Sequence, residues 1–111
     1  METITDDQMR AMLSTARPYT VIILRKGPNH GMDGGEAIIW EHGRRNFALR
    51  ADGRLAIVCP VSDGSDVAGV GIFALDVDET RTVMEADPGV QAGVFIVEAH
   101  ACRSFPGDAL P

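Results

Sequence analysis

The stretch that decides the fold is Thr20-Val21-Ile22-Ile23-Leu24, an unbroken run of β-branched and apolar residues. Such a run is typical of a strand that is buried on both faces. A glycine-rich loop, Gly27 to Gly35, comes next, and residues 36–52 then have the length of a helix. Gly53 stands where a glycine commonly ends a helix. The stretch therefore predicts a strand, a loop and a helix in succession.

The rest of the chain adds further strands and a second helix of the domain. Apolar runs predict strands at Leu55–Val58, Val70–Val77 and Val94–Cys102. Asp76, with Glu79 three residues later, indicates a helix start, and this helix is expected to end at Ala86 before Pro88. The resulting order, β-α-β-β-α-β, is that of the ferredoxin-like α+β fold, in which two helices cover one face of a four-stranded antiparallel sheet.

An additional helix is expected at the N-terminus. Thr5 and Gln8 fit a capping box, and apolar residues then recur at helical spacing as far as Ala16. We expect residues 5–16 to form a short amphipathic helix laid onto the domain. The chain then divides into an N-terminal helical extension, residues 1–17, and one domain, residues 18–111, which ends in an irregular tail.

The predicted strands carry more apolar surface than two helices can cover. A bare apolar sheet face would form a large exposed patch, which soluble monomers rarely tolerate. Sheet-to-sheet pairing into a homodimer, a dimeric α/β barrel, would bury it. The first helix of the domain also has two apolar sides, one with Ile38, His42 and Leu49 and one with Trp40, Phe47 and Ala51. We expect the second side to be covered by the N-terminal helix or by a partner chain.

The composition of the chain indicates which classes of binding partner and which cellular location to expect. Its 111 residues allow one domain, and 45% hydrophobic with 23% charged residues is typical of a globular protein. A net charge of −6 argues against nucleic-acid binding, which depends on Lys and Arg. No segment reaches the roughly 20 apolar residues of a membrane span, and the acidic N-terminus differs from a signal peptide. We expect a cytoplasmic protein whose Cys59 and Cys102 are free thiols on opposite sheet edges.

Two residues stand out as candidates for chemistry. His42 shares a helix side with Ile38 and Leu49, so it should point inward, and Asp87 follows the second helix of the domain at the end unfavourable for a carboxylate. A nearby His42 would remove that objection, and an aspartate that orients an imidazole is a general acid–base device. The alternatives are a core histidine satisfied by one hydrogen bond and a solvated acid at a helix end.

In these residues and their order the chain resembles the YCII-related (YciI-like) family. The resemblance rests on His42 before a helical stretch, on Gly53-Arg54-Leu55, on the Pro60 turn and on the segment from Asp87-Pro88 to Gly93. It covers roughly residues 19–105. It implies a ferredoxin-like dimer with an active site around His42 and Asp87. A few family members resemble or act as enzymes on small ring compounds, including the dehydrochlorination of a hydroxyquinol.

The resemblance has one departure, Cys59-Pro60 where the family usually has Gly-Pro. A thiol there could face the pocket, or Cys59 could be a small buried apolar residue. Trp40 and Arg45 are expected to line the approach for an anionic or aromatic substrate, and Ser62 is a further candidate for ligand binding. No phosphate loop, dinucleotide fingerprint or metal-ligand spacing is present in the sequence, so we expect neither cofactor nor metal.

Two functions follow from these observations. The first is a cofactor-independent small-molecule enzyme of lyase, isomerase or dehydrochlorinase type, in which His42 moves a proton and Asp87 orients it. The second is a non-catalytic domain that binds a small ligand or serves as an accessory module, with the same two residues as a structural pair.

Overall fold

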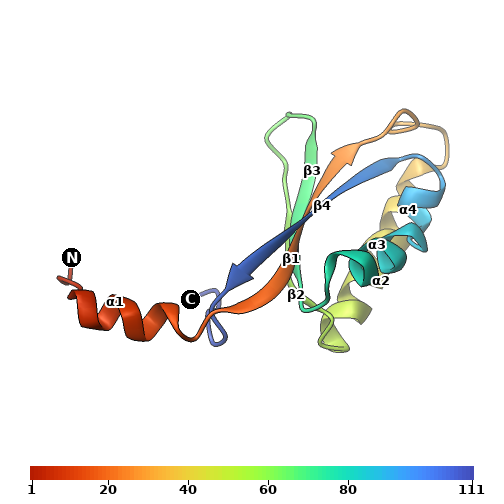
Figure 1. Ribbon diagram of the computed structural model, residues 1–111. Helices are drawn as coiled ribbons and strands as arrows, with labels where there is room; N and C mark the ends of the chain where they lie inside the picture. The colour runs from red at the N-terminus through yellow and green to blue at the C-terminus, as the bar shows by residue number, and fades with distance from the viewer.

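The computed structural model describes all 111 residues and confirms the ferredoxin-like α+β fold (Figure 1). Its elements are α1 (Asp6–Leu13), β1 (Arg17–Lys26), α2 (Gly35–Ala51), β2 (Leu55–Pro60), β3 (Val67–Phe73), α3 (Val77–Glu85), α4 (Pro88–Gln91) and β4 (Phe95–Ser104). The helices α2, α3 and α4 all lie on one side of the sheet, and α1 projects on the other side. None of these helices is long and apolar enough to cross a membrane.

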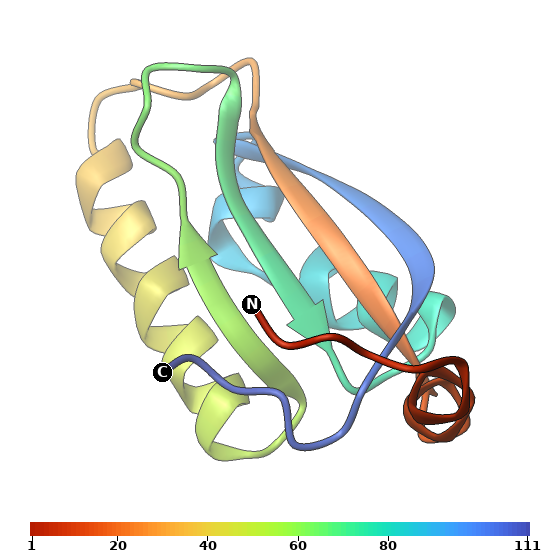
Figure 2. The ribbon, with the colours of Figure 1, turned by 90° about the vertical axis from the view of Figure 1, so that its left-hand side faces the viewer.

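The four strands form one antiparallel sheet in the order β2-β3-β1-β4. The central strand β1 pairs with β3 and, over its whole length from Arg17 opposite Ser104 to Lys26 opposite Phe95, with β4. The two edges are therefore β2 and β4. Figure 2 shows α2 running alongside the edge strand β2, behind the open face of the sheet.

The helix-covered face of the sheet holds the core. In β1, Thr20, Ile22 and Leu24 are buried and alternate with half-buried residues, as expected for a strand with one covered face. Thr20 is satisfied because its hydroxyl donates to the carbonyl of Leu75 at 2.8 Å. The buried apolar residues of the core are Ile22, Leu24, Leu49, Leu55, Phe73, Met84, Val94 and Phe95.

The opposite face of the sheet has no helix over it (Figure 2). Val21 and Ile23 of β1 are half-buried there, so within one chain β1 is fully buried on one face only. Towards β4 this face is polar: Arg25 and His100 both contact the Glu98 carboxylate, at 3.2 and 2.7 Å. These hydrogen bonds, that of His100 foremost, lower the pKa of Glu98. The open face thus has an apolar middle and a charged margin along β4.

The N-terminal helix forms as predicted but lies elsewhere. Thr5 and Gln8 make the complete capping box, and α1 follows. The expectation that this helix is laid onto the domain was wrong, because none of its residues is buried and it extends away from the sheet (Figure 1). The radius of gyration, 16.2 Å, accordingly exceeds the value of about 13 Å for a compact chain of this length.

Two predicted boundaries in the second half of the chain need correction. The strand expected to reach Val77 ends at Phe73, and Val77 instead begins α3 behind its N-cap Asp76. Pro88 was expected only to end a helix. It also begins the short helix α4, where its missing N–H and fixed φ suit the first turn.

Candidate acid–base site

The helix α2 directs His42 towards the interior. His42 and Leu49 lie on the side of α2 that is buried, and the imidazole packs at 4.8 Å from the ring of Phe95 in β4. Only 8% of the His42 residue is exposed. The predicted inward orientation is therefore what the structure shows.

Asp87 lies at the other side of the site and is completely buried. It is the N-cap of α4, where its Oδ2 accepts the N–H groups of Gly89 at 2.9 Å and Val90 at 3.2 Å. From the sequence, Asp87 was expected at the negative end of a helix, which is unfavourable for a carboxylate. It does follow α3, but it also caps the positive end of the next helix, α4. Asp87 begins a helical turn, where a carboxylate is favourable.

The two side chains form a buried pair. Nδ1 of His42 lies 2.9 Å from Oδ1 and 2.8 Å from Oδ2 of Asp87. An ionised carboxylate only accepts hydrogen bonds, so the hydrogen of this contact is on Nδ1. In the neutral imidazole the lone pair is then on Nε2, the nitrogen that remains available for chemistry.

Asn46 contacts this second nitrogen and was not among the residues predicted from the sequence. Its Nδ2 lies 3.1 Å from Nε2 of His42, which suits an amide N–H donated to the lone pair. The sequence did contain a signal, since Asn46 follows His42 by four residues and such residues meet on one helix face. A half-buried asparagine beside the histidine adds a hydrogen-bond donor to the site.

Arg45 supports Asp87 and does not line the pocket. Its Nη2 donates to the carbonyl of Val83 in α3 at 2.6 Å, and its Nη1 lies 3.8 Å from Oδ1 of Asp87. The buried carboxylate therefore has a cation nearby besides its hydrogen bonds. Arg45 thus places a positive charge close to Asp87, although no hydrogen bond joins the two side chains.

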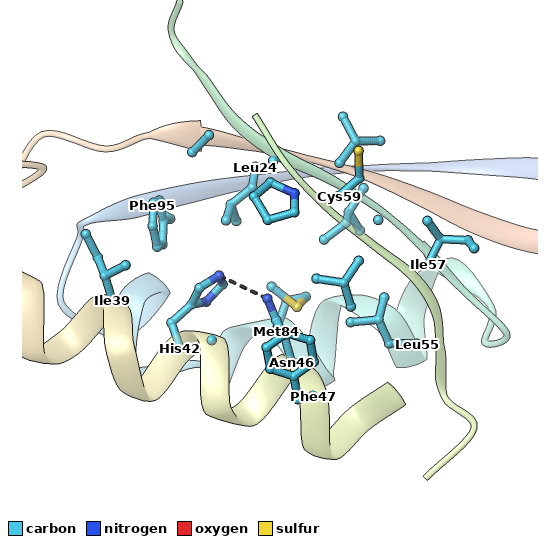
Figure 3. Close-up of a pocket in the computed structure, with 18 residues that line it drawn as sticks. Leu24, Ile39, His42, Asn46, Phe47, Leu55, Ile57, Cys59, Met84 and Phe95 are labelled. Carbon is cyan, nitrogen blue, oxygen red and sulfur yellow. Dashed lines mark hydrogen bonds between the residues drawn. The ribbon is translucent and has the colours of Figure 1, made fainter. Parts of the chain in front are cut away.

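A pocket of about 230 Å³ opens beside His42, between α2 and the strands β2 and β3. Figure 3 shows His42 and Asn46 on its helix side, with Phe95 and Leu24 across from them. No Lys, Arg, Asp or Glu lines this pocket. An apolar pocket with a few convergent polar groups has the usual composition of a small-molecule site.

The other residues predicted to bind ligand lie outside this cluster. Trp40 is 70% exposed and faces outward from α2, and Ser62 is exposed in the loop after β2. Cys59 borders the pocket at the edge strand, but its sulfur points away from α2 in Figure 3 and the residue is exposed. Cys59 is thus not a buried apolar residue, and its sulfur does not point towards His42.

No group of three or more His, Cys, Asp and Glu side chains is arranged to hold a metal ion. What the site offers chemically is one imidazole nitrogen with a lone pair, one amide donor and an apolar wall. No protein-family model matches the chain, and a search of curated proteins finds no similar sequence.

Proposed function

We propose that the pocket beside His42 is the active site of a cofactor-independent enzyme that moves a proton on a small, uncharged molecule. The observation that carries this proposal is the Asp87 carboxylate, held at 2.8 Å from Nδ1 of His42, while the other imidazole nitrogen is at the pocket. Reactions of the lyase, isomerase and dehydrochlorinase classes can begin with such a proton abstraction.

The chemistry assigns one role to each of three side chains. Nε2 of His42 accepts a proton from the substrate, and Asp87 stabilises the imidazolium that forms. Asn46 gives up its contact with Nε2 and donates its amide N–H to the substrate oxygen on which negative charge develops. The proton then returns to a different substrate atom in an isomerase, or leaves with the departing group in a lyase.

The pocket supports a particular class of substrate. Its volume, about 230 Å³, exceeds the roughly 150 Å³ of a cavity that holds benzene, so a single ring with small substituents fits. A charged ligand would be buried without a counter-ion, since no lining residue has a formal charge other than His42 when protonated. We therefore favour a neutral ring compound with one oxygen. The aromatic substrate expected from the sequence is thus kept, and the anionic one is set aside.

The resemblance to the YCII-related family supports the same residues and a homodimer. In this proposal the open face of the sheet pairs with that of a second copy. The exposed area of the single chain, 7401 Å², exceeds by about 1,500 Å² the value of about 5,900 Å² expected for a folded monomer of 11.9 kDa. The projecting helix α1, which has no buried residue, contributes to this excess, and the whole excess is larger than the roughly 800 Å² that a standard interface takes from each partner.

The proposal can be tested without knowing the physiological substrate. A panel of neutral single-ring ketones and phenols is incubated with the protein in D₂O, and NMR follows deuterium incorporation at acidic C–H positions. We expect incorporation to fall by about 10²–10⁴-fold in His42→Gln and in Asp87→Asn, because proton transfer loses its base or the orientation of that base. Thr82→Ala, on the exposed side of α3, is the control and should exchange like the native chain.

Two outcomes would contradict the proposal. One is exchange that persists in both variants while circular dichroism shows them folded. The other is binding of panel compounds at the pocket with no exchange of any ligand proton. The second outcome would favour the non-catalytic ligand-binding domain. The contact that Asn46 already makes with Nε2 of His42 supports that alternative.

A further inference from the structure

The outward side of α2 carries an apolar stripe that nothing covers. It consists of Ile39, Trp40, Gly43 and Phe47, and the three side chains are 36%, 70% and 54% exposed. The stripe forms a shallow hollow over Gly43, where an added Cβ would meet no other part of the chain within 4 Å. Large apolar side chains gathered in this way mark an interaction surface.

The helix α1 also has an apolar side that no other part of the chain covers. Met9, Met12 and Leu13 lie on one side of this helix and are 45%, 49% and 54% exposed. The complete capping box fixes where the helix begins, so the apolar side has a defined shape although it touches nothing. A helix of eight residues is marginal in water without tertiary packing, which indicates that α1 packs against something.

The helix and the stripe match in length and in charge. Eight residues of α1 and the eight-residue step from Ile39 to Phe47 both span about 12 Å. The first turn of α1 carries Asp6 and Asp7, while Arg50 stacks at 4.7 Å over Phe47 beside the stripe. Glu36 and Arg44 flank the stripe, so a helix placed on it with Asp6 and Asp7 towards Arg44 and Arg50 would be matched by opposite charge.

The two surfaces cannot meet within one chain. Figures 1 and 2 both place α1 on the open side of the sheet and α2 on the other side. Only Ser14, Thr15 and Ala16 connect α1 to β1, and three extended residues reach about 10 Å at most. That length does not carry α1 around the sheet to its own α2.

We propose that α1 packs on the stripe of α2 in a second copy of this chain, and that the exchange is reciprocal. In a dimer joined through the open faces, α1 projects on the side where the second copy lies, and it would reach the stripe of that copy by passing the edge strand β2, beside which α2 runs. The proposal thus rests on the homodimer proposed above, and it makes no use of the chemistry of His42.

The exchange has a consequence for the pocket. Ile39, Gly43 and Phe47 belong to the stripe and also line the pocket that contains His42. A helix lying on the stripe therefore covers the mouth of the pocket at the side of α2. Each pocket is then completed by an apolar helix of the other subunit, which excludes water from the neighbourhood of His42.

Trp40 provides the test, because it is the only tryptophan of the chain. We expect the native protein to show a short-wavelength emission maximum and weak quenching by acrylamide. Met12→Glu should shift the emission to longer wavelength and raise the quenching constant severalfold. Ala11→Glu places the same charge on the opposite side of α1 and is the matched control, which should resemble the native protein.

A mixture shows whether the covering helix comes from the other subunit. Copies with Met12→Glu are mixed with an excess of copies carrying Trp40→Phe, so that all emission comes from chains whose own α1 is defective. We expect Trp40 to become shielded again in the mixture. The proposal is overturned if Trp40 of the native protein is freely quenched, if Met12→Glu leaves it shielded, or if the mixture shows no recovery. None of these results depends on proton exchange at His42.

Discussion

Asp87 shows how one side chain can serve the fold and the site together. The same carboxylate begins α4, contacts Arg45 and accepts the Nδ1 hydrogen of His42. Because Asp87 is fully buried, each of these partners would be left without a hydrogen bond or counter-charge if the carboxylate were removed. The orientation of the imidazole is therefore as firmly held as the backbone turn that carries Asp87.

We predict that Asp87→Ala lowers the free energy of unfolding by about 2–4 kcal/mol, the combined cost of a lost N-cap and of buried donors left unpaired. Asp87→Asn keeps one acceptor oxygen and should cost less. Urea unfolding followed by circular dichroism measures both values. Equal losses in the two variants would show that the ionised carboxylate itself, and neither the shape of the side chain nor one acceptor oxygen, determines what this residue contributes.

The sequence led to His42 and Asp87 but not to their surroundings. An inward histidine can be inferred from helical spacing, because Ile38 and Leu49 define the buried side of the same helix. The role of Arg45 could not be inferred, since its guanidinium reaches the carbonyl of Val83 in another helix, 38 residues away. Contacts of this kind depend on how two helices cross, which the spacing within one helix does not contain.

At the scale of the elements, the four-residue helix α4 holds the site together. It packs so closely on β4 that a Cβ added to Gly89 would lie 2.6 Å from Cδ2 of Phe95 and 3.1 Å from Oδ2 of Asp87. Phe95 in turn contacts the imidazole of His42. Only a glycine allows α4, Phe95 and His42 to approach in this way.

We predict that Gly89→Ala destabilises the protein by about 1–3 kcal/mol, the usual range for an overpacked core, and displaces the ring of His42. Unfolding measurements give the first effect, and the NMR signals of the imidazole give the second. Gly35→Ala, where a Cβ would meet only the flexible side chain of Met32 at 3.4 Å, is the control and should be nearly neutral. A native-like histidine spectrum in Gly89→Ala would contradict the proposed packing role.

Pro88 explains why α4 and the position of Asp87 escaped prediction. A proline ends a helix and also starts one well, and the sequence alone favoured the first interpretation. The end of β3 was missed for a related reason: Val77 is apolar enough to extend a strand, yet it begins α3 because Asp76 caps the N–H of Glu79 at 2.8 Å. The order of strands and helices was nevertheless predicted correctly, since it depends on long apolar runs.

At the scale of the whole molecule, two apolar surfaces lie open in a single chain. One is the middle of the sheet around Val21 and Ile23, and the other is the stripe on α2. The apolar excess of the sheet was evident from composition and strand length alone. The projection of α1 was not, because an amphipathic pattern indicates that one side is buried and leaves open against what.

We predict that the protein sediments as a dimer and that Val21→Lys converts it to a monomer by placing a charge in the middle of the open face. Thr82→Lys, on the exposed surface of α3, adds the same charge away from this face and should remain dimeric. Analytical ultracentrifugation at several concentrations distinguishes the two. A dimer that withstands Val21→Lys would show that the sheet is not the interface.

The central position of β1 also governs when the protein can fold during synthesis. β1 is made early, yet its neighbour β4 ends at Ser104, 87 residues after the partner Arg17. Pairing across so long a loop is slow, and on the ribosome it must wait until β4 has emerged. Until then the apolar strand Thr20–Leu24 has one edge without hydrogen-bond partners, so the nascent chain has a period in which chaperones, rather than its own sheet, must protect it from aggregation.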